Sequence, residues 1–309
     1  MQKIMEYKTS IGITLALLSA LIYAIQTAIV KHTAPTVSTP VLVFIQSIVC
    51  FLCIIPVIFA QGKSKAIKLV CTNHPWLHLA RTVFSLGISY FLFYSVASIP
   101  LVDGVLLTNT APLWVPIIGV LFLSRRIDNR LWMPLAIGFA GIVLVLKPGG
   151  EIFNVASLFA LFAGICMAAS MTLVKEAKND SGLTNAFYYF MYAIPFTAIG
   201  AMLNWTPISL DTFGLLIGVG LLFFVVQLSL IYALKLISAQ IASTLYLSNI
   251  IFAAIIGWIV WHTPLTLLGF FGIALTMTGA ILTIRAQTKL VEGTPSPINR
   301  LLSKPASFV

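Results

Sequence analysis

Residues 16–31 read ALLSALIYAIQTAIVK, and residues 160–175 read ALFAGICMAASMTLVK. The two segments share alanine, leucine, valine and final lysine positions at an offset of 144 residues (160 minus 16). Farther along, FYSVASIPLVDGVLL at 93–107 aligns with IYALKLISAQIASTL at 231–245 at an offset of 138 (231 minus 93). This second register continues without a gap into the last apolar stretch. The chain therefore consists of two related halves, a feature that weak internal sequence symmetry reveals.

Apolar stretches dominate both halves. Hydrophobic residues make up 60% of the chain and charged residues only 8%, whereas a soluble domain carries about 25% charged residues. Most stretches reach the roughly 20 residues that a helix needs to cross the hydrocarbon, where backbone groups must be satisfied internally. We therefore predict an all-α integral membrane protein with ten transmembrane helices, at 11–30, 40–60, 76–98, 103–123, 131–146, 154–174, 184–203, 212–234, 240–261 and 265–285.

The positive charges fall on one side of the predicted membrane. With the N-terminus in the cytoplasm, all 18 Lys and Arg residues except Lys31 and Lys147 lie in cytoplasmic loops, tails or helix ends. This agrees with the positive-inside rule, so we expect both termini on the cytoplasmic side of a bacterial inner membrane. The same topology explains the net charge of +10, since flanking cations sit well against anionic lipid. The basic character therefore gives no reason to expect a nucleic-acid partner.

Each predicted half contains five helices, within 11–147 and 153–285. Because five is odd, the second half begins on the opposite side of the membrane, and the halves are inverted relative to each other. Inverted repeats are typical of secondary transporters, whose substrate site lies near the bilayer midplane between the repeats. The remaining residues, 286–309, are polar and contain several prolines, and we predict a disordered cytoplasmic tail there.

Polar side chains inside the predicted helices are candidates for the substrate site, because polar groups in lipid are costly. Three pairs of positions that the repeat makes equivalent are polar in both halves: Gln26 with Ser170, Ser89 with Gln227, and Thr108 with Tyr246. A pseudo-twofold axis in the membrane plane would gather these pairs around one central space. The alternative is that the side chains form hydrogen bonds between helices and contact no substrate.

Four further residues complete the candidate substrate site. Asn109 and Asn249 lie near mid-membrane, where an amide offers donors and acceptors to a neutral heterocycle or a zwitterion. Trp114 could stack on a planar ligand, although packing between helices is the alternative for all three of these residues. Arg81 lies about 7 Å inside its helix, at about 1.5 Å per residue. It is either a side chain that snorkels to the interface or an anchor for a carboxylate or phosphate.

Acidic residues are absent from the middle of every predicted span. Asp103 and Asp211 lie at outer helix starts, where a carboxylate can cap a helix and meet its dipole. Proton-coupled carriers usually expose a carboxylate along the transport path, so we expect facilitated transport or exchange. A desolvated cationic drug would also lack a counter-charge, which argues against a multidrug pump.

No residue pattern points to an enzyme, a metal site or a cofactor. His74 and His78 are four residues apart, but Pro75 intervenes, so we predict no metal ligands. The four cysteines have the character of small buried hydrophobic residues. We also expect no catalytic residues, because an intramembrane enzyme would need a nucleophile or metal cluster near one interface. Such an enzyme and a receptor-like membrane protein are the alternatives from other functional classes.

Two helix ends follow the pattern Y-x-x-x-x-I, from Tyr94 to Ile99 and from Tyr232 to Ile237. Together with the TAPLWVPIIGVLFL and SNIIFAAIIGWIVW helices and a glycine-bearing last helix in each half, they resemble the EamA-domain branch of the drug/metabolite transporter superfamily. The resemblance implies ten helices, a central cavity and alternating access. Members of that family move amino acids, nucleobases, nucleosides, adenosylated metabolites, vitamins, sugars or toxic compounds.

One departure from the family pattern follows the fourth and ninth predicted helices. The family often has a Glu at each of these places, whereas this chain has Arg125 and Thr263. Any role of those carboxylates in gating or folding is therefore absent here.

The sequence thus predicts a secondary transporter that moves a small neutral or zwitterionic metabolite, such as an amino acid or a nucleoside, by alternating access. The expected partners are this small-molecule substrate and membrane lipid, and the chain is either a monomer or a homodimer. A multidrug or toxic-compound exporter, or a lipid-linked flippase of the same fold, is the alternative.

Overall fold

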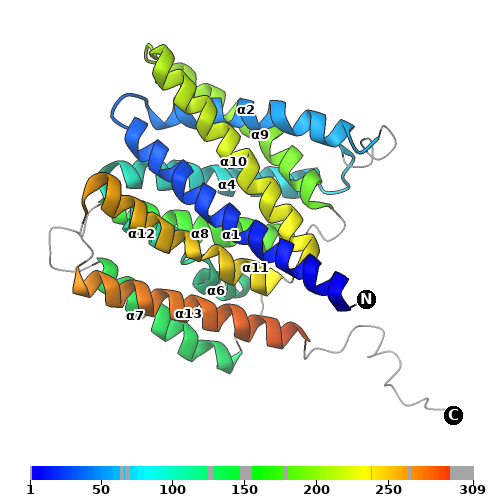
Figure 1. Ribbon diagram of the computed structural model, residues 1–309, viewed down its shortest axis with the longest axis vertical. Helices are drawn as coiled ribbons and strands as arrows, with labels where there is room; N and C mark the ends of the chain where they lie inside the picture. Colours follow the sequence, from blue (N-terminus) through cyan, green and yellow to red (C-terminus); the bar gives the residue numbers. More distant parts are fainter. Residues whose placement is uncertain are drawn as a thin grey trace.

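The computed structural model describes residues 2–62, 66, 70–123, 128–146, 155–176, 180–237, 239–263 and 266–292, and these ranges contain helices and no strand. The helices lie side by side in one bundle (Figure 1). In chain order they are α1 (Gln2–Thr33), α2 (Thr39–Phe59), α4 (Pro75–Ser98), α5 (Leu101–Thr108), α6 (Ala111–Leu123), the short 3-10 helix η1 (Asn129–Leu131), α7 (Trp132–Leu146), α8 (Val155–Glu176), α9 (Gly182–Leu203), α10 (Leu210–Leu236), α11 (Ala239–Tyr246), α12 (Ser248–Trp261) and α13 (Leu267–Glu292).

Length and composition confirm the membrane character of the chain. Within the described residues, 9 helical segments are long and apolar enough to cross a membrane, and Asn129–Val145 is a shorter apolar helix. This shorter helix corresponds to the predicted span 131–146. The chain is therefore an integral membrane protein made of helices.

Two of the predicted spans are interrupted, although the sequence led us to expect continuous helices there. The span at 103–123 divides into α5 and α6 around Asn109 and Thr110, and the span at 240–261 divides into α11 and α12 at Leu247. The repeat offset of 138 makes Asn109 and Leu247 equivalent, so the breaks occupy the same place in each half.

The first break has a clear chemical cause. Pro112 has no N–H to donate to the carbonyl of Thr108, so a continuous helix would lack that hydrogen bond, and α6 starts anew beside the proline. The second break contains no proline. Leu247 keeps near-helical dihedral angles of φ −62° and ψ −14°, so this interruption is milder.

The outer bounds of the helices also differ from the prediction at two places. Helix α1 begins at Gln2, before the predicted start at 11. Helix α13 continues to Glu292, so the first seven residues of the predicted tail, 286–292, are helical. The rest of the predicted tail, 293–309, lies outside the described residues.

Helices α7 and α13 pack on each other through glycine. A Cβ on Gly279 would meet the backbone of Gly138, and a Cβ on Gly141 would meet the backbone of Thr276. Residue numbers rise along one helix as they fall along the other, so the two helices are antiparallel. The offset of 138 makes Gly141 equivalent to Gly279 and Gly138 equivalent to Thr276, so exchanging the halves maps one contact onto the other.

The contacts between the remaining helices also match when the two halves are exchanged. Helix α1 packs most extensively on α10, and its repeat equivalent α8 packs most extensively on α4, the equivalent of α10. Helix α2 packs on its own equivalent, α9, and these two lie together near the top of Figure 1. The main helix contacts of one half are therefore matched by equivalent contacts of the other half.

Candidate functional site

A group of polar side chains gathers among the apolar helices. Its members come from α1, α4, α9, α11, α12 and the break between α5 and α6, and all are buried or half-buried. We call this group the central polar cluster, and it consists of Tyr23, Arg81, Ser89, Asn109, Tyr189, Tyr246 and Asn249.

Two amides meet where the interrupted spans come together. Asn249, at the start of α12, donates from Nδ2 to Oδ1 of Asn109 over 3.5 Å, and Asn109 donates from Nδ2 to the carbonyl of Val105 over 2.8 Å. Both side chains are buried, at 4% exposure for Asn109 and 0% for Asn249. The Oδ1 atom of Asn249 is buried and has no hydrogen-bond partner among the described residues. The breaks therefore place one unused acceptor among buried side chains.

Tyrosine rings continue the cluster away from the amides. The Tyr246 side chain lies near that of Asn249, and its ring centre is 5.7 Å from that of Tyr23. Tyr189 lies near Tyr23 and near Ser89. Phenols combine a flat apolar face with a polar tip, so they can hold both parts of an amphipathic solute.

Arg81 forms the far end of the cluster. Its guanidinium carbon is 5.9 Å from the centre of the Tyr189 ring, and Nη1 donates to the backbone carbonyl of Asn185 over 2.6 Å. The Nε atom is buried and has no hydrogen-bond partner among the described residues. A cation in a membrane-spanning helix normally pairs with a carboxylate or marks a substrate path.

The N-terminal end of α4 contacts Asp180, which lies just before α9. We call this end of α4 the Asp180 end. Nε2 of His78 lies 2.7 Å from Oδ2 of Asp180, and Thr72 donates to the same oxygen over 2.7 Å. The His78 ring stacks on Tyr188 with a centroid distance of 4.8 Å. Desolvation acts to raise the pKa of Asp180. The hydrogen bonds from Thr72 and His78 and the charges of nearby imidazoles outweigh it, so this pKa lies below its ordinary value.

Replacing Asp180 with asparagine should loosen the Asp180 end. The lowered pKa means that the carboxylate form is the one bound in this arrangement. Its contribution is complete above the ordinary carboxyl pKa and is lost as the pH falls through the lowered value, so at neutral pH the contact is intact. Hydrogen bonds to charged groups contribute about 1.5–3 kcal/mol, so opening should become about tenfold more frequent. The measurement is the alkylation rate at Ser85→Cys in a cysteine-free background.

Asp128→Asn is the matched control for this prediction, because Asp128 is also acidic but accepts a hydrogen bond from the backbone of Arg130. It should leave the alkylation rate unchanged. Equal rates for both variants would show that the His78–Asp180 contact does not restrain the Asp180 end.

The opposite end of α4 is held to α1 and α12, and we call it the Lys31 end. Nζ of Lys31 donates to the carbonyls of Val96 and Ile99 over 2.6 and 2.7 Å. It also lies 5.6 Å from the centre of the Trp261 ring. The last carbonyls of a helix have no partner within the helix, so a cation placed there is favourable. Both ends of α4 are therefore fastened in this conformation, with the central polar cluster between them.

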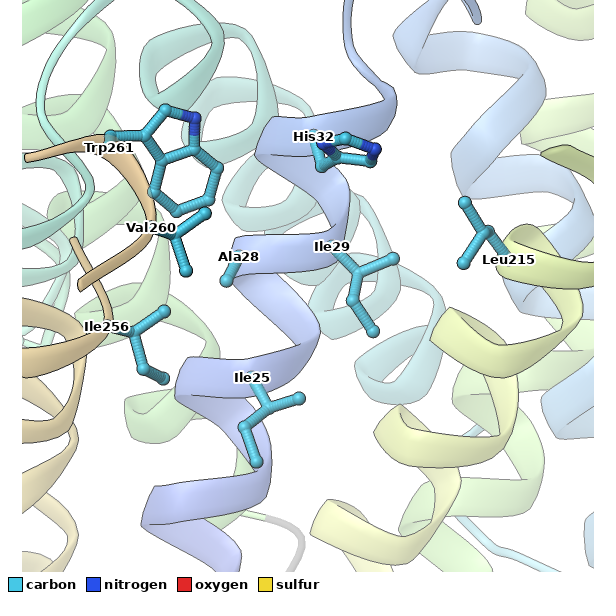
Figure 2. A pocket seen from close by; sticks show the side chains of 8 residues that line it. All are labelled: Ile25, Ala28, Ile29, His32, Leu215, Ile256, Val260 and Trp261. Carbon is cyan, nitrogen blue, oxygen red and sulfur yellow. The ribbon is translucent and has the colours of Figure 1, made fainter.

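Near the Lys31 end, α1, α10 and α12 line an open pocket with a volume of about 280 Å³ (Figure 2). The lining side chains converge on it from all three helices: Ile25, Ala28, Ile29, His32, Leu215, Ile256, Val260 and Trp261. Apart from His32 and Trp261 this lining is apolar, and it contains no member of the central polar cluster. It offers few hydrogen bonds to a polar solute, so the cluster is the stronger candidate for a substrate site.

The structure brings together five of the predicted site residues and places the other five elsewhere. Arg81, Ser89, Asn109, Tyr246 and Asn249 belong to the central polar cluster. The other five have partners or positions of their own: Gln26, Thr108, Trp114, Ser170 and Gln227.

Two of these five residues form hydrogen bonds to neighbouring helices. Gln26 donates to Gln46 over 3.3 Å, and Ser170 lies 2.8 Å from Ser85, oxygen to oxygen. Both are hydrogen bonds between helices, which was the alternative interpretation of the polar pairs.

The remaining three pack locally. The Thr108 hydroxyl donates to the carbonyl of Gly104 within its own helix over 3.0 Å. Trp114 donates to Thr110 over 3.1 Å, and its ring meets Phe139 edge to face. Gln227 is half-buried on α10.

Tyr23 and Tyr189 are not among the residues predicted from the sequence. Neither position is polar in both halves, because the repeat makes Tyr23 equivalent to Met167 and Tyr189 equivalent to Ile45. A helical spacing could have found them, since Tyr23 precedes Gln26 by three residues and Tyr189 follows Asn185 by four. Helix faces that combine an amide and a phenol are therefore a useful signal in such chains.

Comparisons with known proteins give a consistent result. A model of a family described as the EamA-like transporter family matches residues 10–147 and again 154–285. The pseudopaline exporter CntI of Pseudomonas aeruginosa is 26% identical over 278 residues, which covers 89% of this chain and 94% of that protein. A riboflavin transporter of Vibrio cholerae is 24% identical and covers 80% of this chain and 85% of its own length.

Other similar proteins include an S-adenosylmethionine uptake transporter of Rickettsia bellii. It is 22% identical, with 82% of this chain and 86% of that protein covered. A solved structure described as "Crystal structure of protein" has a TM-score of 0.60 at 14% identity, and covers 92% of this chain and 99% of its own. At this identity the likeness concerns the fold alone.

Proposed function

Since the chain belongs to the EamA-like transporter family, we propose that it carries a small neutral or zwitterionic metabolite, such as an amino acid or a nucleoside, across the bacterial cytoplasmic membrane. The observation that supports this most is the meeting of the two interrupted spans at Asn109 and Asn249. In secondary transporters, interrupted helices at equivalent places in two repeats point to the substrate site.

The transport cycle is alternating access between two inverted halves, 11–147 and 153–285, with both termini in the cytoplasm. The antiparallel contact between the equivalent helices α7 and α13 supports the inversion. The exchange of helix contacts between the halves supports it as well. Each of two nearly equivalent halves can adopt the conformation of the other, so an outward-open and an inward-open state have similar energies.

The fastened ends of α4 fit this cycle. Release of the Asp180 end would open the central polar cluster to the expected cytoplasmic side, and release of the Lys31 end would open it to the other side. A substrate that bridges the cluster would change the relative stability of these states, because ligands shift populations only through differential contacts. The relatives include an exporter and an uptake transporter, and the direction of net flux follows the gradients.

The cluster also argues for the metabolite class over a cationic drug. Its charged member is Arg81, and it contains no carboxylate that could balance a desolvated cation. Phenols, amides and one guanidinium instead suit a solute with neutral polar groups or with charges of both signs.

Counterflow in proteoliposomes tests the proposed function. Labelled amino acids, nucleosides and S-adenosylmethionine should include at least one substrate with saturable flux above that of protein-free liposomes. Asn249→Ala should lower this flux about tenfold, because losing a buried hydrogen bond of roughly 1.4 kcal/mol changes an equilibrium by a factor of ten. Thr278→Ala is the control, since the exposed Thr278 hydroxyl donates only within its helix. Absence of flux for the entire panel would refute this substrate class. Equal flux in Asn249→Ala and Thr278→Ala would show that Asn249 does not belong to the substrate site.

A further inference from the structure

On the basis of the transport function given above, we propose that the substrate carries an α-amino-acid group that binds between α4 and α9. Its carboxylate is bound by the guanidinium of Arg81, and its ammonium group is bound by Oδ1 of Asn185. This assigns a substrate class and a polarity to the Asp180 side of the central polar cluster.

The guanidinium of Arg81 has donors to spare. It has five N–H donors, and the described residues provide one acceptor, the Asn185 carbonyl at 2.6 Å. Nε is buried and has no hydrogen-bond partner in the part of the chain that the structure describes. The ion pair found among the described residues joins His78 to Asp180 instead. A buried cation without a counter-charge is unfavourable to the fold, so its retention needs another reason, and binding an anion is such a reason.

The surroundings of Arg81 favour a flat, forked anion. The guanidinium carbon lies over the Tyr189 ring, 5.9 Å from the ring centre. The guanidinium is a planar fork of N–H donors, and this fork matches a carboxylate through two parallel hydrogen bonds.

Asn185 supplies the complementary acceptor. Its Nδ2 donates to the carbonyl of Ser181 over 3.1 Å, which fixes the orientation of the amide because its oxygen could not make that bond. Oδ1 is consequently the free atom, and it is buried without a partner among the described residues. The backbone carbonyl of the same residue accepts from Arg81. An unused donor and an unused acceptor therefore stand beside one hydrogen bond, as a zwitterion requires.

Other substrate chemistries fit these groups less well. A phosphate generally calls for more than one cation or a helix N-terminus in addition. A neutral nucleoside would leave the guanidinium without a counter-charge. The rest of an amino-acid-like substrate can extend toward Tyr23 and Tyr246, where the aromatic rings lie 5.7 Å apart.

Thermal-shift measurements on the full-length protein in detergent test the carboxylate contact. The probes are the standard L-amino acids and S-adenosylmethionine, each compared with its carboxamide. At least one probe should raise the melting temperature, and its carboxamide should bind at least tenfold more weakly. Arg81→Gln should abolish this discrimination, and Arg81→Lys should restore part of it. Equal binding of a probe and its carboxamide to the wild-type protein would overturn the proposal.

The ammonium contact has its own test. Asn185→Leu should reduce the discrimination between the bound amino acid and its analogue without the amino group, while the preference for carboxylate over carboxamide persists. A variant that loses both preferences together would show that Asn185 only supports the fold.

The melting temperature without ligand separates a binding role of Arg81 from a structural one. Removing an unpaired buried cation should leave the melting temperature of Arg81→Gln unchanged or higher, although binding is lost. A clear decrease would identify Arg81 as a structural contact and overturn the proposal.

If a nucleoside is transported while no amino-acid probe binds, this proposal fails and the transport function stands; if neither class is transported, the proposed function fails as well.

Discussion

Replacing Gly279 with leucine should prevent the protein from folding. A side chain at this position would have to enter space that the backbone of Gly138 on α7 already occupies. Overpacking a core costs about 1–3 kcal/mol even when side chains can adjust, and here a helix backbone must move. Since whole domains are stable by only about 5–15 kcal/mol, separating α7 from α13 removes a large share of the stability. Close approach of helix backbones through small residues is a main source of helix association in membranes.

The measurement is the yield and elution profile of a fluorescent fusion in detergent, followed by its melting temperature. Gly279→Leu should give aggregate or no protein. Gly218→Leu is the matched control, because a Cβ on Gly218 of α10 would meet nothing within 4 Å. If the two variants had similar yields and melting temperatures, the glycine contact would not hold the bundle together.

Replacing Lys31 with methionine should open the Lys31 end. The ammonium group of Lys31 makes two hydrogen bonds to the terminal carbonyls of α4, at Val96 and Ile99. Each bond to a charged group is worth about 1.5 kcal/mol at the low end of the range, so together they contribute about 3 kcal/mol. An equilibrium changes tenfold for about every 1.4 kcal/mol, so opening should become on the order of 100-fold more frequent.

Ser95 provides the probe for this prediction, because it is fully buried beside Val96, at 0% exposure. Ser95→Cys, in a cysteine-free background, should be alkylated faster by a membrane-impermeant maleimide when Lys31 is methionine. Lys235→Met is the control: Lys235 also lies over an aromatic ring, 4.7 Å from the centre of Tyr232, but at the end of α10. A rate that responds equally to both substitutions, or to neither, would contradict a restraining role for Lys31.

The membrane fold was predictable because its determinant is local. An apolar segment long enough to cross the hydrocarbon must form a helix, since lipid offers its backbone no other hydrogen-bond partners. The predicted spans at 40–60, 76–98, 154–174 and 184–203 accordingly each correspond to one helix in the structure. The interruption at Asn109 was predictable in principle from Pro112, whereas the one at Leu247 has no residue that marks it.

The candidate site was predictable only in part. Asn109, Asn249 and Arg81 stood out because each is polar where lipid would exclude it. Ser170 and Gln26 stood out for the same reason, yet their hydrogen-bond partners are Ser85 and Gln46, which are not members of the central polar cluster. Polarity shows that a side chain needs a partner, and it does not show whether that partner is another helix or a solute.

By itself, the sequence determined that the chain spans a membrane, which segments are apolar enough to do so and that its two halves are related, because hydropathy and internal similarity depend on the order of residues alone. Only the tertiary structure decided that Arg81 faces Tyr189 and Asn185, and that Asn109 meets Asn249. Those residues lie on segments far apart in the chain, and their meeting depends on the angle and depth at which helices pack.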